Sequence, residues 1–289
     1  MLFPLFSLAC TLVRAPGLPQ ALPESQPQND DALMQTVSVR SITAANWAVP
    51  LEGLVDLTDP AAAELEEGPY EMEVLVHVIE HPVHGRWLVD SGVSQEPGER
   101  VADAGVLLGG FLKDMEVLTS TAELLEEGSV AGVLLTHMHV DHVLGLQDLP
   151  LDTPLWTGPG EGSTRSGQNL LLRPWYSQAF SGRSLQSFDV GQAQSFGPVP
   201  VAWDLFGDGS VWVLSTPGHT AGSIAVWART EQGPVLMTGD TSHTRWGWEH
   251  DVTPGTYTED HVDNAEALAQ LRALAALDPA TQVVFGHER

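Results

Sequence analysis

Strand-like patterns of hydrophobic and polar positions begin near residue 34. Residues 35–40 (QTVSVR) and 70–79 (YEMEVLVHVI) alternate polar and apolar side chains, which is typical of strands with one exposed face. Residues 130–135 (VAGVLL) form a continuous apolar run, which predicts a buried strand. We therefore expect one folded domain over residues 34–289, built largely on β-sheet.

Two stretches carry apolar residues at helical spacing. Residues 261–277 place Ala and Leu on one face and Asp, Glu and Gln on the other, and Pro279 follows as a stop signal, so the pattern predicts an amphipathic helix. Apolar residues also recur at helical intervals over 102–127, ahead of Gly128. This spacing predicts a second helix, which leads into the strand at 130–135.

Residues 160–197 are weakly patterned, with Gly, Ser, Gln and Arg interleaved with Trp175, Tyr176 and Phe180. We expect loops and a short helix that lie over the functional site. The aromatic side chains have two interpretations: they line an apolar substrate pocket, or they pin a long loop to the core.

The first 33 residues read as an apolar leader followed by a tether. Met1 to Val13 is apolar but too short to span a bilayer, and residues 15–31 are rich in Pro, Gln and acidic side chains. Ser7 to Cys10 resembles a bacterial lipoprotein cleavage box, with Ser7 in the place of the usual Leu. We expect an exported or membrane-anchored protein on the periplasmic or extracellular side, lipidated at Cys10. The alternative is a cytoplasmic protein with an apolar N-terminus.

Charge and cysteine content narrow the functional classes. The chain carries 12 Lys and Arg against 38 Asp and Glu, a formal net charge of −26. Such a surface repels phosphate backbones, so nucleic acid is an unfavourable partner, although charge alone names no other partner. A single cysteine can form no internal disulfide, so stability must come from core packing and from metal.

The densest chemical signal is Thr136 to His142 (THMHVDH), directly after the predicted strand at 130–135. In an extended chain His137 and His139 project to the same side, and Asp141 and His142 lie where the chain must turn. Imidazole and carboxylate suit zinc and similar ions, and four donors in six residues exceed what one tetrahedral site needs from one segment. The segment therefore indicates two metals; a ligand-free surface cluster would have no reason to follow a core strand.

Later strands also end in residues that can bind metal. His219, Asp240 and His287 each follow an apolar run and a glycine, within TPGHT, TGD and FGH. Asp90 closes an earlier strand at LVDSG, where it either aims its carboxylate into a site at the sheet edge or caps the turn. Strand ends that each deliver such a residue are what a metal site at one edge of a sheet requires.

In this order, THMHVDH, TPGHT, TGD and FGH resemble the metallo-β-lactamase superfamily, and the match runs from about LVDSG to the C-terminus. The segments STPGHTAGS and GDTSHT are most similar to its N-acyl-homoserine lactonase-like branch. The resemblance implies an α/β fold, a four-layer αβ/βα sandwich of two mixed β-sheets flanked by helices.

The resemblance also implies a dinuclear centre with two divalent ions, Zn²⁺ foremost, with Mn, Fe or Co as alternatives. Such ions, roughly 3.5–4 Å apart, share a hydroxide that attacks an ester or lactone carbonyl, and Asp141 would carry the proton to the leaving oxygen. By position, the first ion is held by His137, His139 and His219, the second by Asp141, His142 and His287, and Asp240 bridges them.

The resemblance implies a small-molecule substrate, but it determines the substrate class less closely than the metal ligands. An acid in the bridging place is a feature of lactonases and of glyoxalase II, so a glyoxalase II-like thioesterase is the alternative enzyme. A non-catalytic metal-binding lipoprotein is the alternative among proteins that are not enzymes. Where the lactonases carry Tyr, three residues after the bridging Asp, this chain has His243. We expect His243 to donate a hydrogen bond to the substrate carbonyl, or else to be an exposed loop histidine. The remaining histidines, at 77, 81, 84, 250 and 261, show no ligand spacing.

Overall fold

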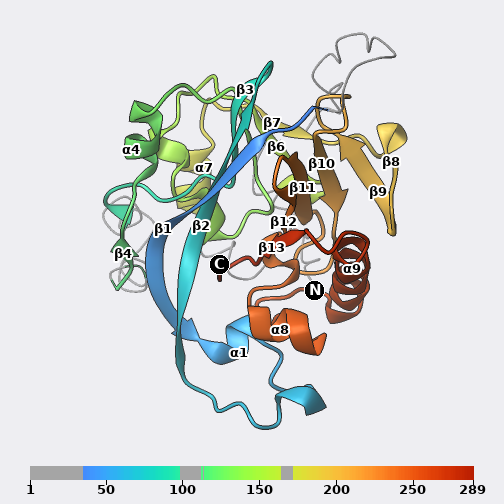
Figure 1. Ribbon diagram of the computed structural model, residues 1–289. Helices are drawn as coiled ribbons and strands as arrows, with labels where there is room; N and C mark the ends of the chain where they lie inside the picture. The colour runs from blue at the N-terminus through green and yellow to red at the C-terminus, as the bar shows by residue number, and fades with distance from the viewer. Residues whose placement is uncertain (1–34, 98–111, 113, 164–171) are drawn as a thin grey trace, which may run out of the picture.

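The computed structural model describes residues 35–97, 112, 114–163 and 172–289, which form a pair of mixed β-sheets packed against each other with helices outside (Figure 1). The first sheet has seven strands in the order β4-β1-β2-β3-β5-β6-β7, and the second has six in the order β13-β12-β11-β10-β9-β8. The predicted leader, residues 1–33, lies outside the described residues. None of the described helices is long and apolar enough to cross a membrane.

The first sheet is antiparallel from β4 to β3 and parallel from β3 to β7. Because the parallel strands β3, β5 and β6 run in one direction, the residues that follow them meet at the same sheet edge. The strands are β1 (Ser38–Pro50), β2 (Pro69–His81), β3 (Gly85–Val89), β4 (Glu116–Val117), β5 (Gly132–Leu134), β6 (Leu155–Thr157) and β7 (Leu185–Ser187).

The second sheet is antiparallel except for its last pair, β12 and β13, which are parallel. Its members are β8 (Gln194–Phe196), β9 (Val199–Asp204), β10 (Val211–Ser215), β11 (Ile224–Thr230), β12 (Gly233–Met237) and β13 (Gln282–Val284). The parallel pair places the residues after β12 and after β13 beside each other, and these are the predicted ligands Asp240 and His287.

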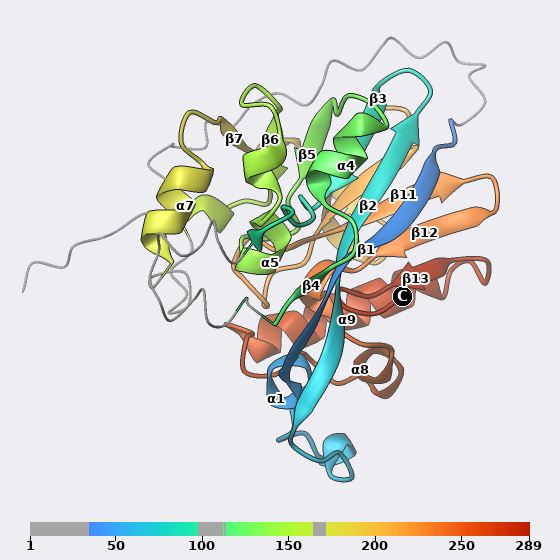
Figure 2. The same ribbon diagram turned by 90° about the vertical axis from the view of Figure 1, so that its left-hand side faces the viewer.

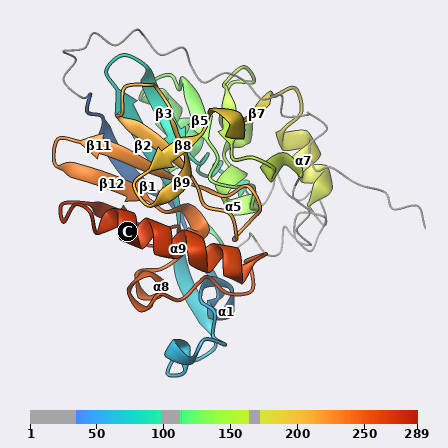
Figure 3. The same cartoon turned by 90° about the vertical axis from the view of Figure 1, so that its right-hand side faces the viewer.

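Three hydrophobic clusters separate the layers. One lies between the sheets, where Trp87 and Leu134 of the first sheet meet Trp203 and Val213 of the second. Another lies between the first sheet and the helices on its outer face, which Figure 2 shows. The third packs α9 against the second sheet, as Figure 3 shows. The predicted four-layer αβ/βα sandwich is confirmed.

The described helices are short apart from α9, and the predicted helix at 261–277 is confirmed as α9 (His261–Ala275). The others are α1 (Leu51–Leu54), α4 (Thr121–Glu126), α5 (Val140–Val143), α7 (Arg173–Ala179) and α8 (Arg245–His250), with 3-10 turns η1 (Pro60–Ala62), η2 (Leu146–Asp148), η3 (Glu161–Ser163), η4 (Val190–Gln192) and η5 (Gly239–Thr241).

Two expectations about local structure are corrected. The helix predicted over 102–127 does not continue through the residues of that stretch that the structure describes, because Glu116–Val117 pairs with β1 and Ser120 then starts α4 with a capping box to Glu123. The rest of that stretch lies outside the described residues. In the predicted loop region 160–197, the short strands β7 and β8 extend the two sheets, in addition to the expected helix, α7.

Candidate metal centre

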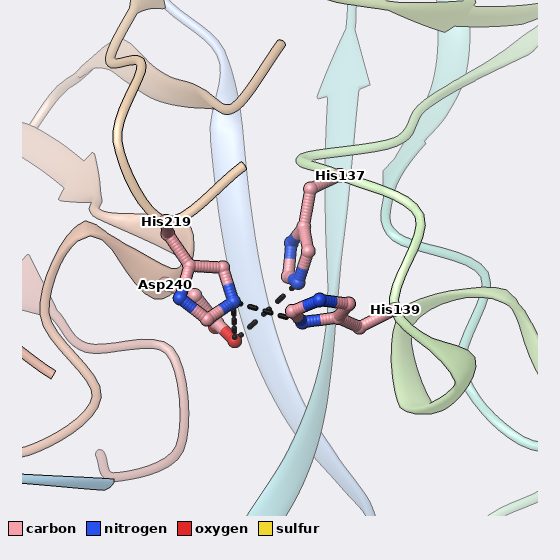
Figure 4. Close-up of side chains that lie close together, drawn as sticks. All are labelled: His137, His139, His219 and Asp240. Atoms are coloured by element: carbon pink, nitrogen blue, oxygen red, sulfur yellow. Dashed lines mark hydrogen bonds and ion pairs between the residues drawn. The ribbon is translucent and has the colours of Figure 1, made fainter. Parts of the chain in front are cut away.

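The residues of the predicted metal site converge at one edge of the two sheets. His137 and His139 lie on the loop after β5, with Asp141 and His142 in α5; the residues from the other sheet are His219 after β10, Asp240 in η5 and His287 after β13. They form two groups, and in each the ligand atoms lie within 4.8 Å of one another. One group is His137, His139, His219 and Asp240 (Figure 4), and the other is Asp141, His142 and His287.

A single carboxylate oxygen, Oδ2 of Asp240, lies at the middle of both groups. It is 3.3 Å from Nε2 of His142 and 3.3 Å from Nε2 of His219. The corresponding distances are 3.5 Å to His137 and 3.2 Å to His287. Two ligand atoms on one tetrahedral zinc ion are about 3.4 Å apart, so these separations suit atoms that share a cation.

Several of the converging atoms are buried and make no hydrogen bond. They include Nε2 of His137, Nε2 of His142 and Oδ1 of Asp240. Leaving a buried polar atom without a partner costs about 1–3 kcal/mol, more for a charged group, and a divalent cation removes that cost by accepting the lone pairs. The donor set therefore fits the metal ions that the motif implies.

Burial and neighbouring charges shift the pKa values of the converging side chains in different directions. Burial lowers the pKa of His137 and of His219 well below the ordinary 6.5, which keeps both rings neutral. Burial also acts to lower the pKa of His142, but the carboxylates of Asp240, Asp90 and Asp141 together raise it well above that value. Burial acts to raise the pKa of Asp240, but the surrounding histidines act to lower it. The combined effect of the histidines is larger, so the pKa lies well below its ordinary value. Asp240 thus carries a negative charge at the middle of the two groups.

Asp90 supports the site from behind the ligands. Its carboxylate accepts the Nδ1–H of His142 at 2.8 Å and the backbone N–H of Thr136 at 2.7 Å. In the neutral ring, the bond to Asp90 keeps the proton on Nδ1 of His142, so that Nε2 presents its lone pair to the cluster. Asp90 sits at a positive φ of 60°, so it also forms the turn that ends β3. The carboxylate is thus aimed toward the site, while the backbone of Asp90 forms the turn.

Glu161 was not identified from the sequence. Its side chain is fully buried, and burial raises its pKa. The carboxylate accepts the backbone N–H of Met138 at 2.7 Å, the hydroxyl of Thr220 at 2.7 Å and the N–H of Gly222 at 3.1 Å. Glu161 thus ties the loop with His137 and His139 to the turn with His219. No local pattern marks it, because its partners are distant in the sequence.

The aromatic side chains singled out in the 160–197 region pin this segment to the core. Trp175, Tyr176 and Phe180 are buried in the cluster beneath the helices of the first sheet. The hydroxyl of Tyr176 donates to the carbonyl of Met138 at 2.6 Å, which fixes the middle of the HMHVDH loop. The substrate-pocket interpretation does not hold for these side chains.

A cavity of about 190 Å³ opens beside the converging residues. Its polar side carries His139, Asp141, Asp240 and His243, among others. The apolar wall is contributed by Trp47, Val49, Leu54, Met72, Leu172 and Tyr257. A mostly apolar pocket with a few convergent polar groups is the usual form of a small-molecule site.

His243 belongs to this cavity, so the interpretation as an exposed loop histidine is wrong. The residue is 2% exposed, and its Nε2 lies 3.0 Å from Oδ2 of Asp240. A hydrogen bond between Nδ1 of His243 and the backbone carbonyl of Leu54 in α1 holds the ring in this buried position. The other histidines, at 77, 81, 84, 250 and 261, lie outside the ligand groups of the described residues, as expected.

The fold and the His/Asp donor set together define a metal-dependent hydrolase. The sequence profile of the metallo-beta-lactamase superfamily matches residues 64–287. The chain therefore belongs to the metallo-beta-lactamase superfamily, as the sequence resemblance predicted.

Individual relatives include proteins named as a gamma-lactamase and as an N-acyl homoserine lactonase. The chain is 29% identical over 249 residues to the gamma-lactamase FDB1 of Fusarium pseudograminearum, covering 78% of this chain and 56% of that protein. The chain thus spans little more than half the length of this relative. It is 26% identical over 229 residues to the N-acyl homoserine lactonase AttM of Azorhizobium caulinodans, covering 76% and 83% of the two chains.

Solved structures agree on the fold. An N-acyl homoserine lactone hydrolase with N-hexanoyl-L-homoserine bound at its catalytic metal centre has a TM-score of 0.66 at 18% identity, covering 89% of this chain and 94% of that one. The dizinc quorum-quenching lactonase AidC has a TM-score of 0.55 at 13% identity, covering 89% of each chain.

Proposed function

We propose that the protein binds two divalent ions, Zn²⁺ foremost, and hydrolyses a cyclic ester with an apolar substituent. The observation that carries this proposal is a single one: two His/Asp ligand groups share Asp240 at the polar side of an apolar cavity. His137, His139 and His219 would hold one ion, Asp141, His142 and His287 the other, and Asp240 both.

When bound, the two ions supply Lewis-acid activation of water and polarisation of the substrate carbonyl. The chain's own residues do the remaining work. The apolar wall with Trp47 and Met72 excludes bulk water and holds the apolar part of the substrate. Asp141 lines the same cavity, so its carboxylate can take a proton and deliver it to the leaving ring oxygen as the ring opens.

The cyclic ester is chosen over other carbonyl substrates on two grounds. AttM relatives from several bacteria are named N-acyl homoserine lactonases, and they are matched over 83% of their length. The described residues that line the cavity offer apolar surface and include no Lys or Arg, which suits an uncharged acyl group better than a phosphate or a carboxylate. The net charge of −26 likewise supports a small-molecule substrate over nucleic acid.

A γ-lactam is the second candidate substrate. Two fungal relatives, at 29% and 34% identity, are named gamma-lactamases, although the matches span 56% and 59% of their lengths. Opening a cyclic amide requires proton delivery to a leaving nitrogen in place of an oxygen, and Asp141 can serve either leaving group. Side-by-side turnover of a lactone and its lactam analogue separates the two candidates.

A hydrolysis panel tests the proposal, with N-acyl homoserine lactones, γ-lactams, a glutathione thioester and a β-lactam as substrates. We expect lactone turnover by the wild-type protein, loss of at least about 100-fold in His139→Ala, and none in the matched control His250→Gln, whose ring lies outside the ligand groups of the described residues. Full lactone turnover by His139→Ala would refute the metal mechanism. Turnover of the thioester alone would move the protein to the glyoxalase II-like alternative.

Lipid anchoring at Cys10 and an exported location form a separate proposal, which rests on the sequence of the first residues. Mass spectrometry of the mature N-terminus tests it. A chain that begins at an acylated Cys10 is the expected result, and an intact Met1 in the native host would contradict it.

A further inference from the structure

One ring nitrogen of His243 faces the ligand cluster without a hydrogen-bond partner among the described residues. Its Nε2 is buried, makes no hydrogen bond, and lies 3.0 Å from Oδ2 of Asp240. The other ring nitrogen, Nδ1, lies 3.2 Å from the backbone carbonyl oxygen of Leu54. His243 was expected from the sequence to donate a hydrogen bond to the substrate, and these two contacts decide whether it can.

The carbonyl of Leu54 fixes the tautomer of His243. A carbonyl oxygen only accepts hydrogen bonds, so Nδ1 must carry the proton and donate it. In a neutral ring Nε2 then holds a bare lone pair and cannot donate to a substrate carbonyl. That lone pair faces a carboxylate oxygen of Asp240, which is also an acceptor, and two acceptors at 3.0 Å repel unless a cation lies between them.

The same two-sided arrangement occurs at a predicted metal ligand, His287. Its Nδ1 donates to the backbone carbonyl of Glu73 at 2.9 Å, and its Nε2 lies 3.2 Å from Oδ2 of Asp240. Metal-binding histidines commonly hold one ring nitrogen to a carbonyl or carboxylate in this way, which aims the other at the ion. Donor atoms of His243, His287 and Asp240 all lie within 4.8 Å of one another.

We propose that His243 is a metal ligand, bound through Nε2 to the ion held by Asp141, His142 and His287. This inference rests on the proposed two-ion centre and goes beyond it, because it adds a donor to the second ion and withdraws the role of substrate hydrogen-bond donor from this residue. A substrate carbonyl would then be oriented by the ions and the apolar wall, with no contribution from His243.

Nitrogen NMR of the ring atoms tests the assignment in the intact, zinc-loaded protein labelled with ¹⁵N-histidine. A free lone-pair nitrogen, a protonated nitrogen and a zinc-bound nitrogen resonate at distinct positions. We expect all six rings of the cluster to show one zinc-bound nitrogen, and the signal of His243 to be the one missing from His243→Asn. Five zinc-bound rings in the wild-type protein, with Nε2 of His243 protonated or free, would overturn the proposal.

Metal affinity gives an independent readout that involves no substrate. Losing a residue that positions a metal ligand lowers metal affinity about 10–100-fold. Losing a ligand itself in His243→Asn should therefore lower the affinity for the second ion at least about 100-fold and leave the first ion in place. The matched control is His250→Gln, since His250 also bonds through Nδ1 to a backbone carbonyl, that of Trp246, but lies away from the ligand groups.

The outcomes separate this proposal from the proposed function. Two ions retained with unchanged affinity in a folded His243→Asn would overturn the ligand role and leave the two-ion hydrolase standing. A wild-type protein that binds only one ion would overturn both. Lactone turnover enters neither measurement, so an inactive protein with six zinc-bound histidine rings would refute the substrate assignment alone.

Discussion

Replacing Glu161 tests how the two halves of the site are held together. The carboxylate of Glu161 accepts three hydrogen bonds: from Met138 in the loop after β5, and from Thr220 and Gly222 in the turn after β10. All three donors are buried in the interior of the described residues, so water cannot easily replace the carboxylate. The turn is also built around Glu161, since a Cβ at Gly222 would lie 2.5 Å from its backbone nitrogen.

Glu161→Ala leaves all three donors without their acceptor. At about 1–3 kcal/mol for each of the three unsatisfied buried donors, the expected loss in the free energy of unfolding is about 3–9 kcal/mol. Glu161→Gln is milder, because its amide oxygen still accepts from Met138 and the hydroxyl of Thr220 can reverse its role. Only the N–H of Gly222 then faces another donor, which predicts a loss of about 1–3 kcal/mol.

The assay is urea denaturation of the metal-free protein, followed by measurement of the affinity for the first ion. We expect Glu161→Gln to lower the affinity for that ion about 10–100-fold, because His139 and His219 lose their relative position. Glu259→Gln is the matched control: Glu259 is exposed and accepts a hydrogen bond from the backbone of Ala221 in the same turn. If the free energies of unfolding of Glu161→Ala and Glu161→Gln both stay within about 0.5 kcal/mol of the wild-type value, Glu161 does not hold the site together.

Three further predictions follow from the contacts of single residues. Burial, with a smaller effect of the His142 charge, lowers the pKa of His77 from 6.5 to about 4, so its contribution to stability is complete above pH 6.5 and is lost as the pH falls toward 4. His77→Gln should therefore remove about 3 kcal/mol from the pH dependence of unfolding of the metal-free protein, measured by urea titration between those values; an unchanged slope would contradict this. Asp90→Asn should weaken the second ion about 10–100-fold, measured by chelator competition, and equal weakening of both ions would argue against its role behind His142. Chelation of ions present at about 100 times their Kd should lower the free energy of unfolding by about 2.7 kcal/mol per ion, and a melting curve insensitive to the chelator would argue against a structural contribution of metal.

The ligand-bearing strand ends could be predicted from the sequence because each combines two local signals. An apolar run with Val and Leu marks a buried strand, and a histidine or acid directly beyond it has few structural reasons to be there. His219, Asp240 and His287 illustrate this, since they follow β10, β12 and β13 closely. Local pattern was sufficient here because strand and ligand are adjacent in the chain.

The elements that sequence pattern missed depend on partners far away in the chain. β4 is two residues long and exists through its pairing with Ala45 and Asn46 of β1, which no periodicity of residues 102–127 can reveal. Glu161 looks like an ordinary loop residue until Met138, Thr220 and Gly222 surround it. The structure of these residues is determined by tertiary contacts and not by local propensity.

His243 shows the same limit for a chemical role. Its distance from Asp240 along the chain marked it as a residue of the site, in the place of the lactonase Tyr. What its ring can do depends on Leu54, a residue 189 positions away whose carbonyl fixes the proton on Nδ1. Sequence could therefore indicate where His243 lies in the site, whereas the direction of its lone pair required the structure.

The most direct measurement is a zinc titration of the metal-free protein with lactone turnover followed at each addition. We predict that turnover is absent without zinc, rises with added zinc and reaches its plateau at two ions per chain, because His137, His139 and His219 form one ligand group and Asp141, His142 and His287 the other, with Asp240 central to both. A plateau at one ion would contradict the dinuclear centre. Full turnover before any zinc is added would contradict a metal-dependent hydrolase altogether.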